Sequence, residues 1–403
     1  MTNQNRRGVT LVELLIVIAL ITLLAALTLP TLRQVLKHSQ VPQAARMVEA
    51  YAESAKSRAI ASGRRVALVI ERARADAGGG VGSDALIANE TSTHLSIAEV
   101  FPPYEGDWAG STATPVSVAG SGYVDAIDIP VAQAATLLDL NQSPPVPNGF
   151  VSLGALVQLG DRSQGFIVSG TPSITLAGNI RIPLANAPSI ALPGTGYAAQ
   201  SNEAMWPLTQ EMADNGVRFK IFRLPSKTMS GSVTLPRGTC IDISCSGVGP
   251  AGRDFSADAI SSGAGIAASA GDYGPIFIVF NPRGSVDIAY FQGRVSNGSG
   301  GYIPGLRRVL PTGVLHFLIG RTEQVQPSNL LAPYSGGQIS SRDDFTSNLN
   351  DASNYWLSLN PYSGNIYTSP VTAVAAPQNP MTVASRLIEA RSNATVAVSS
   401  VGY

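Results

Sequence analysis

The feature that most constrains this chain is an almost uninterrupted apolar run from Val9 to Leu29, which contains three threonines and one acidic residue, Glu13. At about 1.5 Å per residue, a helix over this run is about 31 Å long, close to the ~30 Å hydrocarbon core of a bilayer. The preceding residues 1–8, MTNQNRRG, are polar and basic. We therefore expect a transmembrane helix over 9–29, with a cytoplasmic N-terminus and everything that follows on the other side.

Three ordinary explanations of this run compete. A cleaved secretory signal has a shorter apolar core followed by small residues, and Ala25-Ala26 matches that pattern weakly. A lipoprotein signal needs a cysteine after the run, and the sequence has none there. A plain anchor leaves Glu13 unexplained, because a carboxylate in a spanning helix costs up to about 2.5–3.5 kcal/mol near the bilayer centre and usually marks function.

Arg6-Arg7-Gly8 followed by VTLVELL resembles the cleavage and methylation motif of type IV prepilins and type II secretion pseudopilins. In that family a prepilin peptidase cuts after the glycine and methylates the new N-terminus. The resemblance implies that residues 1–8 are a leader and that Gly8 and Val9 flank the processing site. Glu13 then takes the family's glutamate position and Pro30 its proline position, whereas Val9 departs from the usual phenylalanine.

The resemblance also implies an assembly mechanism. After cleavage, the α-amine of Val9 can pair with Glu13 of a neighbouring subunit in the apolar core of a filament. An unpaired charge is costly there, so the pair favours one axial register. Pro30 removes one helix hydrogen bond and is expected to kink the helix where it leaves the membrane. The implied partners are the prepilin peptidase, other pilin or pseudopilin subunits and the inner membrane, with the head periplasmic or extracted into a filament.

Residues 31–62 continue in a helical pattern, so the pilin-type helix is predicted over 9–62. A stripe of apolar residues can pack on a sheet, Pro42 is expected to bend or restart the helix, and Gly63 is expected to follow its last turn. The stripe consists of Ala44, Val48, Tyr51, Ala55 and Ala59. The next segment, RRVALVIER, predicts a strand with Val66, Leu68 and Ile70 on one face.

This junction carries a second resemblance, to the H-type minor pseudopilins and related minor pilins. Their helix ends in an Ala-Arg-x-x-Ala-Ile-x-x-Gly pattern before a valine-rich strand. Lys56 departs from that pattern, and the positions that keep it are Arg58, Ala59, Ile60, Gly63 and Val66.

The remaining head, 63–403, is rich in glycine and in strand-like runs separated by long loops. Two hairpins are expected around Asn-Pro turns, PIFIVF-NPRG-SVDIAYF and YWLSL-NPYSG-NIYTS, and a helix over 383–392. The predicted fold class is α+β: one long N-terminal helix packed on an antiparallel sheet head with long insertions. Residues 72–272 are interpreted largely as an insertion, and a second domain around 150–250 is the alternative.

Two cysteines, Cys240 and Cys245, leave two alternatives open. Five residues of extended strand separate their Cα atoms by about 17 Å. A disulfide requires less than ~7 Å, so it forms only if the segment between them turns back. The other alternative is a pair of free buried thiols.

Little else in the sequence points to chemistry. His38, His94 and His316 are dispersed, and His316 lies in an apolar run typical of a core histidine. The sequence has none of the HExxH, GxSxG or phosphate-loop motifs, so we expect no enzyme. An oxygen-rich loop is a weak candidate for Ca²⁺, with no other cofactor expected. The loop residues are Asp343, Asp344, Asn348, Asn350 and Asp351.

Acidic and basic residues balance at 27 each, so nucleic acid is not an expected partner, although Arg307-Arg308 could contact one. The sequence thus predicts a structural subunit, a minor pseudopilin or minor pilin of a type II secretion pseudopilus or type IV pilus. The first rival is a binding module for a ligand or DNA that uses pilin export. The second rival is a membrane-anchored enzyme.

Overall fold

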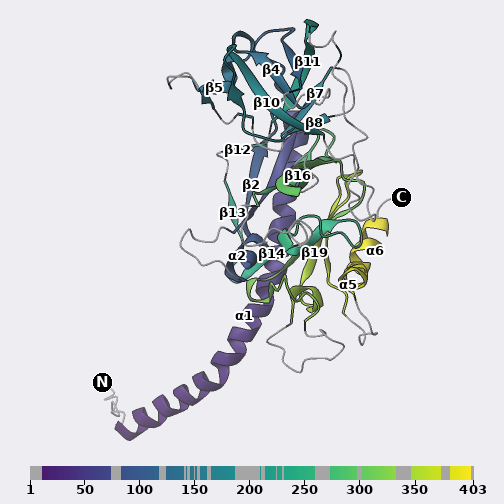
Figure 1. Cartoon of the computed structure of the whole chain (residues 1–403). Coiled ribbons are helices and arrows are strands. Elements are labelled where there is room, and N and C mark those ends of the chain that lie inside the picture. Colours follow the sequence, from purple (N-terminus) through teal and green to yellow (C-terminus); the bar gives the residue numbers. More distant parts are fainter. Residues whose placement is uncertain are drawn as a thin grey trace.

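The computed structural model describes sixteen stretches of the chain. They are residues 11–73, 83–117, 124–139, 142, 146–148, 150–151, 155–160, 165–186, 209, 214–223, 225–228, 231–258, 273–296, 302–332, 346–373 and 382–400. Within this range the chain forms one long helix, a large antiparallel sheet and a smaller, closed sheet (Figure 1).

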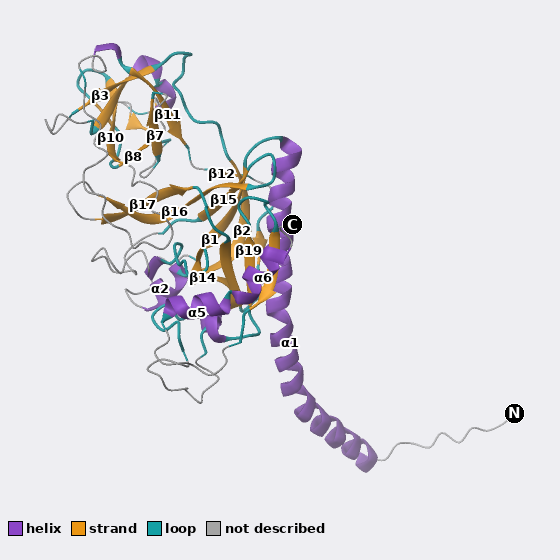
Figure 2. Cartoon of the chain, turned by 90° about the vertical axis from the view of Figure 1, so that its right-hand side faces the viewer, coloured by secondary structure: helices purple, strands orange, loops and turns teal. Residues whose placement is uncertain are grey.

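The long helix α1 (Leu11–Ser62) is 52 residues in length, about 78 Å at 1.5 Å per residue. Its C-terminal half packs on the large sheet, and its N-terminal part extends away from the head on a curved course (Figures 1 and 2). The helix ends at the predicted place, because Gly63 adopts the left-handed conformation with φ of 64°. The expected restart at Pro42 is wrong: the helix is continuous there, because Val41, Ala44 and Ala45 are buried in the head on both sides of the proline.

The large sheet has eleven strands, and all its pairings are antiparallel. Its continuous order is β17-β16-β15-β1-β2-β14-β18-β19-β20, and two short strands also pair with β2. The strands are β1 (Val66–Arg72), β2 (Thr91–Glu99), β14 (Thr239–Val248), β15 (Ile276–Phe280), β16 (Val286–Ser296), β17 (Tyr302–Val309), β18 (Leu315–Arg321), β19 (Tyr355–Leu359) and β20 (Ile366–Pro370). The two short ones are β12 (Ser226–Lys227) and β13 (Val233–Thr234), and helix α2 (Ser83–Asn89) precedes β2.

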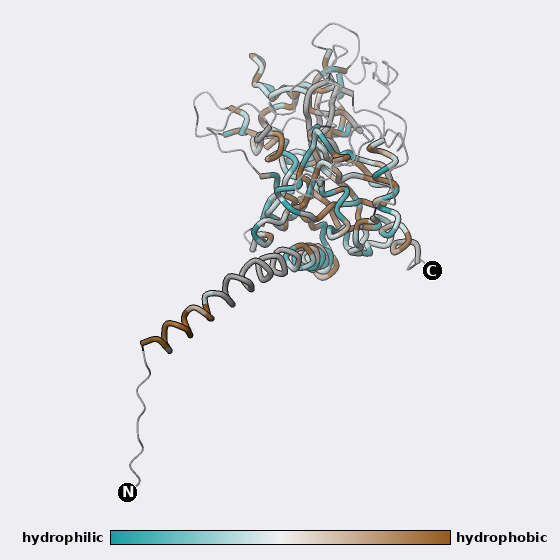
Figure 3. Tube along the Cα trace, turned by 90° about the horizontal axis from the view of Figure 1, so that it is seen from below, coloured by the Kyte–Doolittle hydropathy of each residue, from teal (hydrophilic) through white to brown (hydrophobic). Residues whose placement is uncertain are grey.

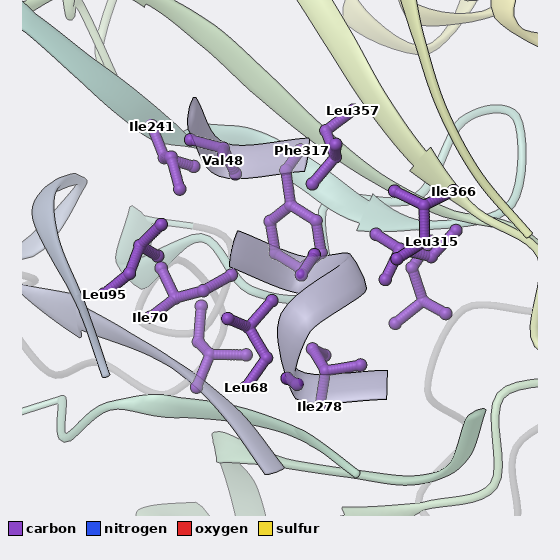
Figure 4. Packing of buried hydrophobic residues seen from close by; sticks show 14 of the residues in the cluster. Val48, Leu68, Ile70, Leu95, Ile241, Ile278, Leu315, Phe317, Leu357 and Ile366 are labelled. Atoms are coloured by element: carbon purple, nitrogen blue, oxygen red, sulfur yellow. The ribbon is translucent and has the colours of Figure 1, made fainter. Parts of the chain in front are cut away.

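Alternation along the strands builds a core on each face of this sheet. One face packs against α1, where the predicted helix stripe meets side chains from seven strands (Figure 4). The residues labelled there are Val48, Leu68, Ile70, Leu95, Ile241, Ile278, Leu315, Phe317, Leu357 and Ile366. The predicted inward face of β1 is confirmed, since Val66, Leu68 and Ile70 all lie in this core.

Two short helices cover the opposite face beside β18 and β19, α5 (Val383–Ala390) and α6 (Ser392–Ser400). Leu318 and Trp356 point to this side and pack against Leu387 and Ala390. Arg391, at the junction of the two helices, is fully buried and donates to the carbonyls of Cys245 (2.6 Å), Gly249 (2.6 Å) and Gly252 (3.0 Å). The Arg391 guanidinium also lies over the Trp356 ring, 4.7 Å from its centroid. This side chain therefore ties the C-terminal helices to β14 and β19.

The smaller sheet closes into a barrel. Its order is β4-β3-β11-β7-β8-β10-β9, and β4 also pairs with β10, so six strands form a closed antiparallel ring. The strands are β3 (Thr112–Val116), β4 (Ala126–Pro130), β7 (Leu156–Leu159), β8 (Gly165–Val168), β9 (Ser173–Ile174), β10 (Asn179–Asn186) and β11 (Val217–Phe222), with the two-stranded β5 (Leu138–Asp139) and β6 (Val146–Pro147) beside them. The barrel has its own core and lies at the end of the head opposite to the free end of α1 (Figures 1 and 2).

A bidentate ion pair spans the two strands that close the barrel. Asp128 and Arg181 are opposite each other on β4 and β10. The Arg181 Nε–Asp128 Oδ1 and Nη2–Oδ2 distances are both 2.7 Å. Asp128 is largely buried. Replacing its carboxylate with a neutral group therefore leaves the Arg181 guanidinium without its anionic acceptor.

Asp128→Asn is therefore expected to lower the free energy of unfolding of the barrel by about 1–2 kcal/mol. Chemical denaturation of the purified chain measures this. Glu105→Gln is the matched control, because the Glu105–Lys220 pair is exposed and such pairs contribute less than about 1 kcal/mol. Equal losses in the two variants would contradict a closing role for the Asp128 pair.

The predicted α+β class with antiparallel sheets is confirmed, and so are both Asn-Pro hairpins, β15–β16 and β19–β20, and the C-terminal helix. The range 72–272, interpreted as an insertion, contributes to both sheets of the head. It contributes β2, β12, β13 and β14 to the large sheet, and it contains the whole barrel. The predicted boundaries themselves stay a prediction.

Candidate functional site

The N-terminal part of α1 carries an apolar surface that the head does not cover. Its large apolar side chains between Leu11 and Ile21 are from 46 % to 77 % exposed. Figure 3 shows this hydrophobic stretch of helix projecting from the head. Contiguous exposed apolar surface of this kind marks contact with a partner or a lipid phase.

Four of the predicted site residues, Gly8, Val9, Glu13 and Pro30, belong to the N-terminal region of the chain. Gly8 and Val9 lie outside the described residues, and the side chains of Glu13 and Pro30 do too, although both positions belong to α1. The backbone of α1 continues through Pro30 as helix, and the kink expected there stays a prediction. Among the described residues, we find no helix whose length and apolar character suffice for crossing a membrane. The predicted transmembrane range 9–29 extends beyond the described part of the chain.

The two cysteines are free and buried. Both lie on β14, whose pairing with β18 is irregular between Asp242 and Gly247. The strand continues through both cysteines, and the structure has them as free thiols, the second of the two alternatives. Burial raises the pKa of both thiols far above the ordinary value, so they are protonated and unreactive.

The described side chains of the oxygen-rich loop form hydrogen bonds within the head. Asn350 Nδ2 donates to the Ala332 carbonyl at 2.8 Å, and its Oδ1 accepts from Arg386 Nε at 2.7 Å. Asp351 accepts from both the backbone and the hydroxyl of Ser353. Asp343 and Asp344 lie outside the described residues. Within the described stretches no three His, Cys, Asp or Glu side chains are grouped for a metal, and Ca²⁺ binding stays untested.

His316 is a satisfied core histidine, as its sequence context predicted. Its Nδ1 lies 2.9 Å from Ser358 Oγ, and its ring meets Trp356 edge to face. Arg308 of β17 lies over the Phe222 ring of β11 at 5.0 Å, so it joins the large sheet to the barrel. The side chain of Arg307 is outside the described residues.

Sequence reasoning missed a group of buried acids beside β14. Glu90 and Asp242 are almost completely buried. Glu90 Oε1 accepts from Ser256 Oγ (2.7 Å) and from the Asp258 amide (2.9 Å). Asp242 accepts from the amide and hydroxyl of Ser244 and from Asn348 Nδ2 (2.9 Å). Asp242 alternates with apolar residues along β14, and Glu90 directly precedes β2, but neither position distinguishes a buried acid from a solvated one in the sequence.

Burial raises the pKa of Asp242 from 3.8 to about 6, with the charge of Glu90 adding to the effect. The folded state therefore holds a proton between pH 4 and 6 that the unfolded state has lost. The stability contributed by that proton is present below pH 4 and is lost as the pH rises through 6, a change of about 3 kcal/mol.

Asp242→Asn is accordingly expected to flatten the decrease in unfolding free energy between pH 4 and 6.5, measured by chemical denaturation at several pH values. Cys240→Ala on the same strand removes packing without removing a carboxyl, so it should lower stability and keep the slope. A slope unchanged in the Asp242 variant would show that this carboxyl does not titrate there.

One described cavity lies at the barrel between Leu137, Pro147, Val151, Pro172 and Ile180, with a volume of about 10 Å³. That is about the space of one water molecule.

Comparison with known proteins agrees with the N-terminal features. Residues 3–29 match the family model of the prokaryotic N-terminal methylation motif, a motif characteristic of type IV pilins and pseudopilins. No curated protein and no solved structure matches the chain significantly. The motif implies processing by a prepilin peptidase and assembly with other pilin-like subunits. The chain therefore carries, directly ahead of and within its long helix, the methylation motif that characterises type IV pilins and pseudopilins.

Proposed function

We propose that this chain is a minor pseudopilin or minor pilin, a structural subunit of a type II secretion pseudopilus or a type IV pilus. One observation carries the proposal. The methylation motif leads into a single helix, α1, whose first turns expose apolar side chains while its second half is buried in an antiparallel head. Such a helix can anchor a subunit in a bilayer and then pack against other helices in a filament.

The proposed life cycle follows from this arrangement. The precursor sits in the inner membrane through residues 9–29, with its N-terminus cytoplasmic and its head periplasmic. Prepilin peptidase removes residues 1–8 after Gly8 and methylates Val9, and Glu13 then sets the register with a neighbouring subunit. Membership of the H-type minor subunits is supported by the helix-to-strand junction at Arg58–Val66 and by the β15–β16 hairpin.

A second candidate function is a binding module exported on a pilin helix. The barrel favours it, because a closed unit with its own core can present a surface independently of the sheet that packs on α1. Binding of nucleic acid by this module would be salt-dependent. A head that binds DNA at low salt and releases it at high salt would favour this candidate over a purely structural role.

Gly8→Leu is the sharpest test of the proposed processing. A bulky side chain at the cleavage junction is expected to abolish removal of the leader, so that the chain accumulates at the precursor mass and is absent from filaments. The readout is the intact mass of membrane-extracted protein from cells with an active prepilin peptidase. Thr2→Leu, within the leader but away from the junction, is the control and should be processed normally. Complete processing of Gly8→Leu would contradict the proposal.

A further inference from the structure

The chain leaves the large sheet and returns to it at neighbouring strands. β2 ends at Glu99, and β12 begins at Ser226, after all the barrel strands. Ser226 pairs with Glu99 in antiparallel register. The Thr228 amide continues this pairing by donating to the Ile97 carbonyl at 3.0 Å. Residues 100–225 are therefore attached to the large sheet as an insertion between two paired strands.

The hydrophobic cores divide at the same two points. The buried core of the barrel extends from Tyr104 to Ile221 in sequence, and among the described residues no side chain of α1 or of the large sheet belongs to it. The core between α1 and the large sheet takes its buried side chains from residues 41–97 and 235–366. The two cores on the opposite face of the sheet, within the described stretches, include none from 101–225. Each unit thus buries its own apolar side chains, as a domain that can fold alone does.

The two connections between the sheet and the barrel brace each other. Arg223, on the returning connection, lies over the Phe101 ring of the outgoing connection, with its guanidinium 5.0 Å from the ring centroid. The same guanidinium lies 4.6 Å from the centroid of Phe150, at the edge of the barrel core. Just inside the barrel, the main-chain amides of Tyr104 and Ile221 donate to each other's carbonyls at 2.8 Å. The barrel therefore closes its own base.

The position of the barrel separates it from the helix that carries the methylation motif. Figure 2 shows the barrel set off to one side of the head, away from α1. Arg308 of β17 contacts the barrel through the Phe222 ring at 5.0 Å, and a cation–π contact between partly exposed residues changes an equilibrium about two- to fivefold. A neighbouring subunit that packs on α1 can therefore do so without contacting the barrel.

We propose that residues 101–225 are an autonomous display module, and that α1 with the large sheet is a complete assembly unit without them. This inference rests on the proposed function, because assembly here means entry into a pilin-type filament. It divides the subunit into a part that assembles and a part that is carried on the outside. An insertion whose two ends lie at paired strand residues leaves the register of the host sheet unchanged, so the sheet can carry the module without altering its own fold.

Unfolding of the full chain in detergent tests the independence of the module. Two transitions are expected, reported by Trp108 in the module and by Trp356 in the large sheet. Asp128→Asn is expected to lower the midpoint of the module transition only. Arg391→Met is the matched variant of the large sheet and should lower the midpoint of the other transition only. A single transition that both variants shift together would overturn the proposal.

Removal of the module tests the assembly unit. Replacing residues 101–225 with Asn-Gly makes β2 and β12 a hairpin with the three-residue loop Val100-Asn-Gly, whose glycine takes the left-handed position. Cells express this barrel-less chain together with the wild type, and the ratio of the two in sheared filaments is compared with their ratio in the membrane. The barrel-less chain is expected to be processed and to be recovered within about twofold of the wild type. Glu13→Leu in the barrel-less chain is the control and should lower recovery roughly 100-fold.

The outcomes separate this inference from the proposed function. Wild-type chain missing from the filaments would contradict the proposed function and, with it, the assembly unit. A folded, processed barrel-less chain that is missing beside incorporated wild type would overturn the display module alone. A second barrel-less variant, with a six-residue Gly-Ser linker in place of residues 101–225, removes any strain at the designed loop. Failure of both barrel-less variants to unfold cooperatively would also overturn the proposal.

Discussion

Glu13→Leu is expected to leave the leader cleaved and the subunit in the membrane, yet to exclude it from filaments. In the proposed assembly the α-amine of Val9 is buried beside the Glu13 carboxylate of a neighbour. Removing one partner leaves a buried charge uncompensated, which costs about 3–5 kcal/mol. That corresponds to a loss of roughly 100-fold or more in the association constant. The measurement is the ratio of variant to wild-type subunit in sheared filaments from cells that express both.

Val12→Leu is the control for this experiment. It changes an exposed apolar position next to Glu13 without touching charge, so its recovery in filaments should match the wild type. Glu13→Gln removes the charge of Glu13 and keeps the shape of its side chain. Its recovery in filaments should be as low as that of the leucine variant. Normal recovery of a processed Glu13→Leu subunit would remove Glu13 from the account of assembly.

Arg391→Met is expected to lower the free energy of unfolding by about 3–5 kcal/mol, the largest effect we predict within the head. The substitution leaves the carbonyls of Cys245, Gly249 and Gly252 buried without their donor, and it removes the cation from the face of Trp356. Burial lowers the pKa of Arg391 to about 10, so the guanidinium is charged at neutral pH and all its donors are available. Chemical denaturation with tryptophan fluorescence measures the loss, because Trp356 lies directly beneath the changed side chain.

Arg391→Lys keeps the charge, but a lysine ammonium cannot donate to three carbonyls as the planar guanidinium does. Its free energy of unfolding should therefore lie between those of Arg391→Met and the wild type. Arg64→Met, at an exposed position after α1, is the surface control and should change the free energy of unfolding by less than about 0.5 kcal/mol. A loss below about 1 kcal/mol for Arg391→Met would mean that this arginine does not hold the C-terminal helices in place.

Local patterns predicted the parts of the fold that depend on local physics. The stripe from Ala44 to Ala59, the helix end at Gly63 and the two Asn-Pro hairpins all appear in the structure as expected. Each is specified by a periodicity or a turn within about 20 residues. The subunit class was predictable for the same reason, because its motif occupies 27 consecutive residues.

The barrel could not be predicted in this way. Closure depends on the pairing of β4 with β10, which places Asp128 beside Arg181 across 53 residues of sequence. The burial of Glu90, Asp242 and Arg391 is equally non-local. Glu90 binds Ser256 and Arg391 binds Gly249, both in the segment after β14, and Asp242 binds Asn348, which lies before β19. The helix did not restart at Pro42, because tertiary packing outweighs the loss of one helix hydrogen bond.

Mass spectrometry of the mature N-terminus, on chain isolated from cells with an active prepilin peptidase, tests the central claim most directly. The account predicts an N-terminal peptide that begins at Val9 and carries one added methyl group on its α-amine. A mature chain that retains Met1–Gly8, or one that begins after Ala26, would contradict it.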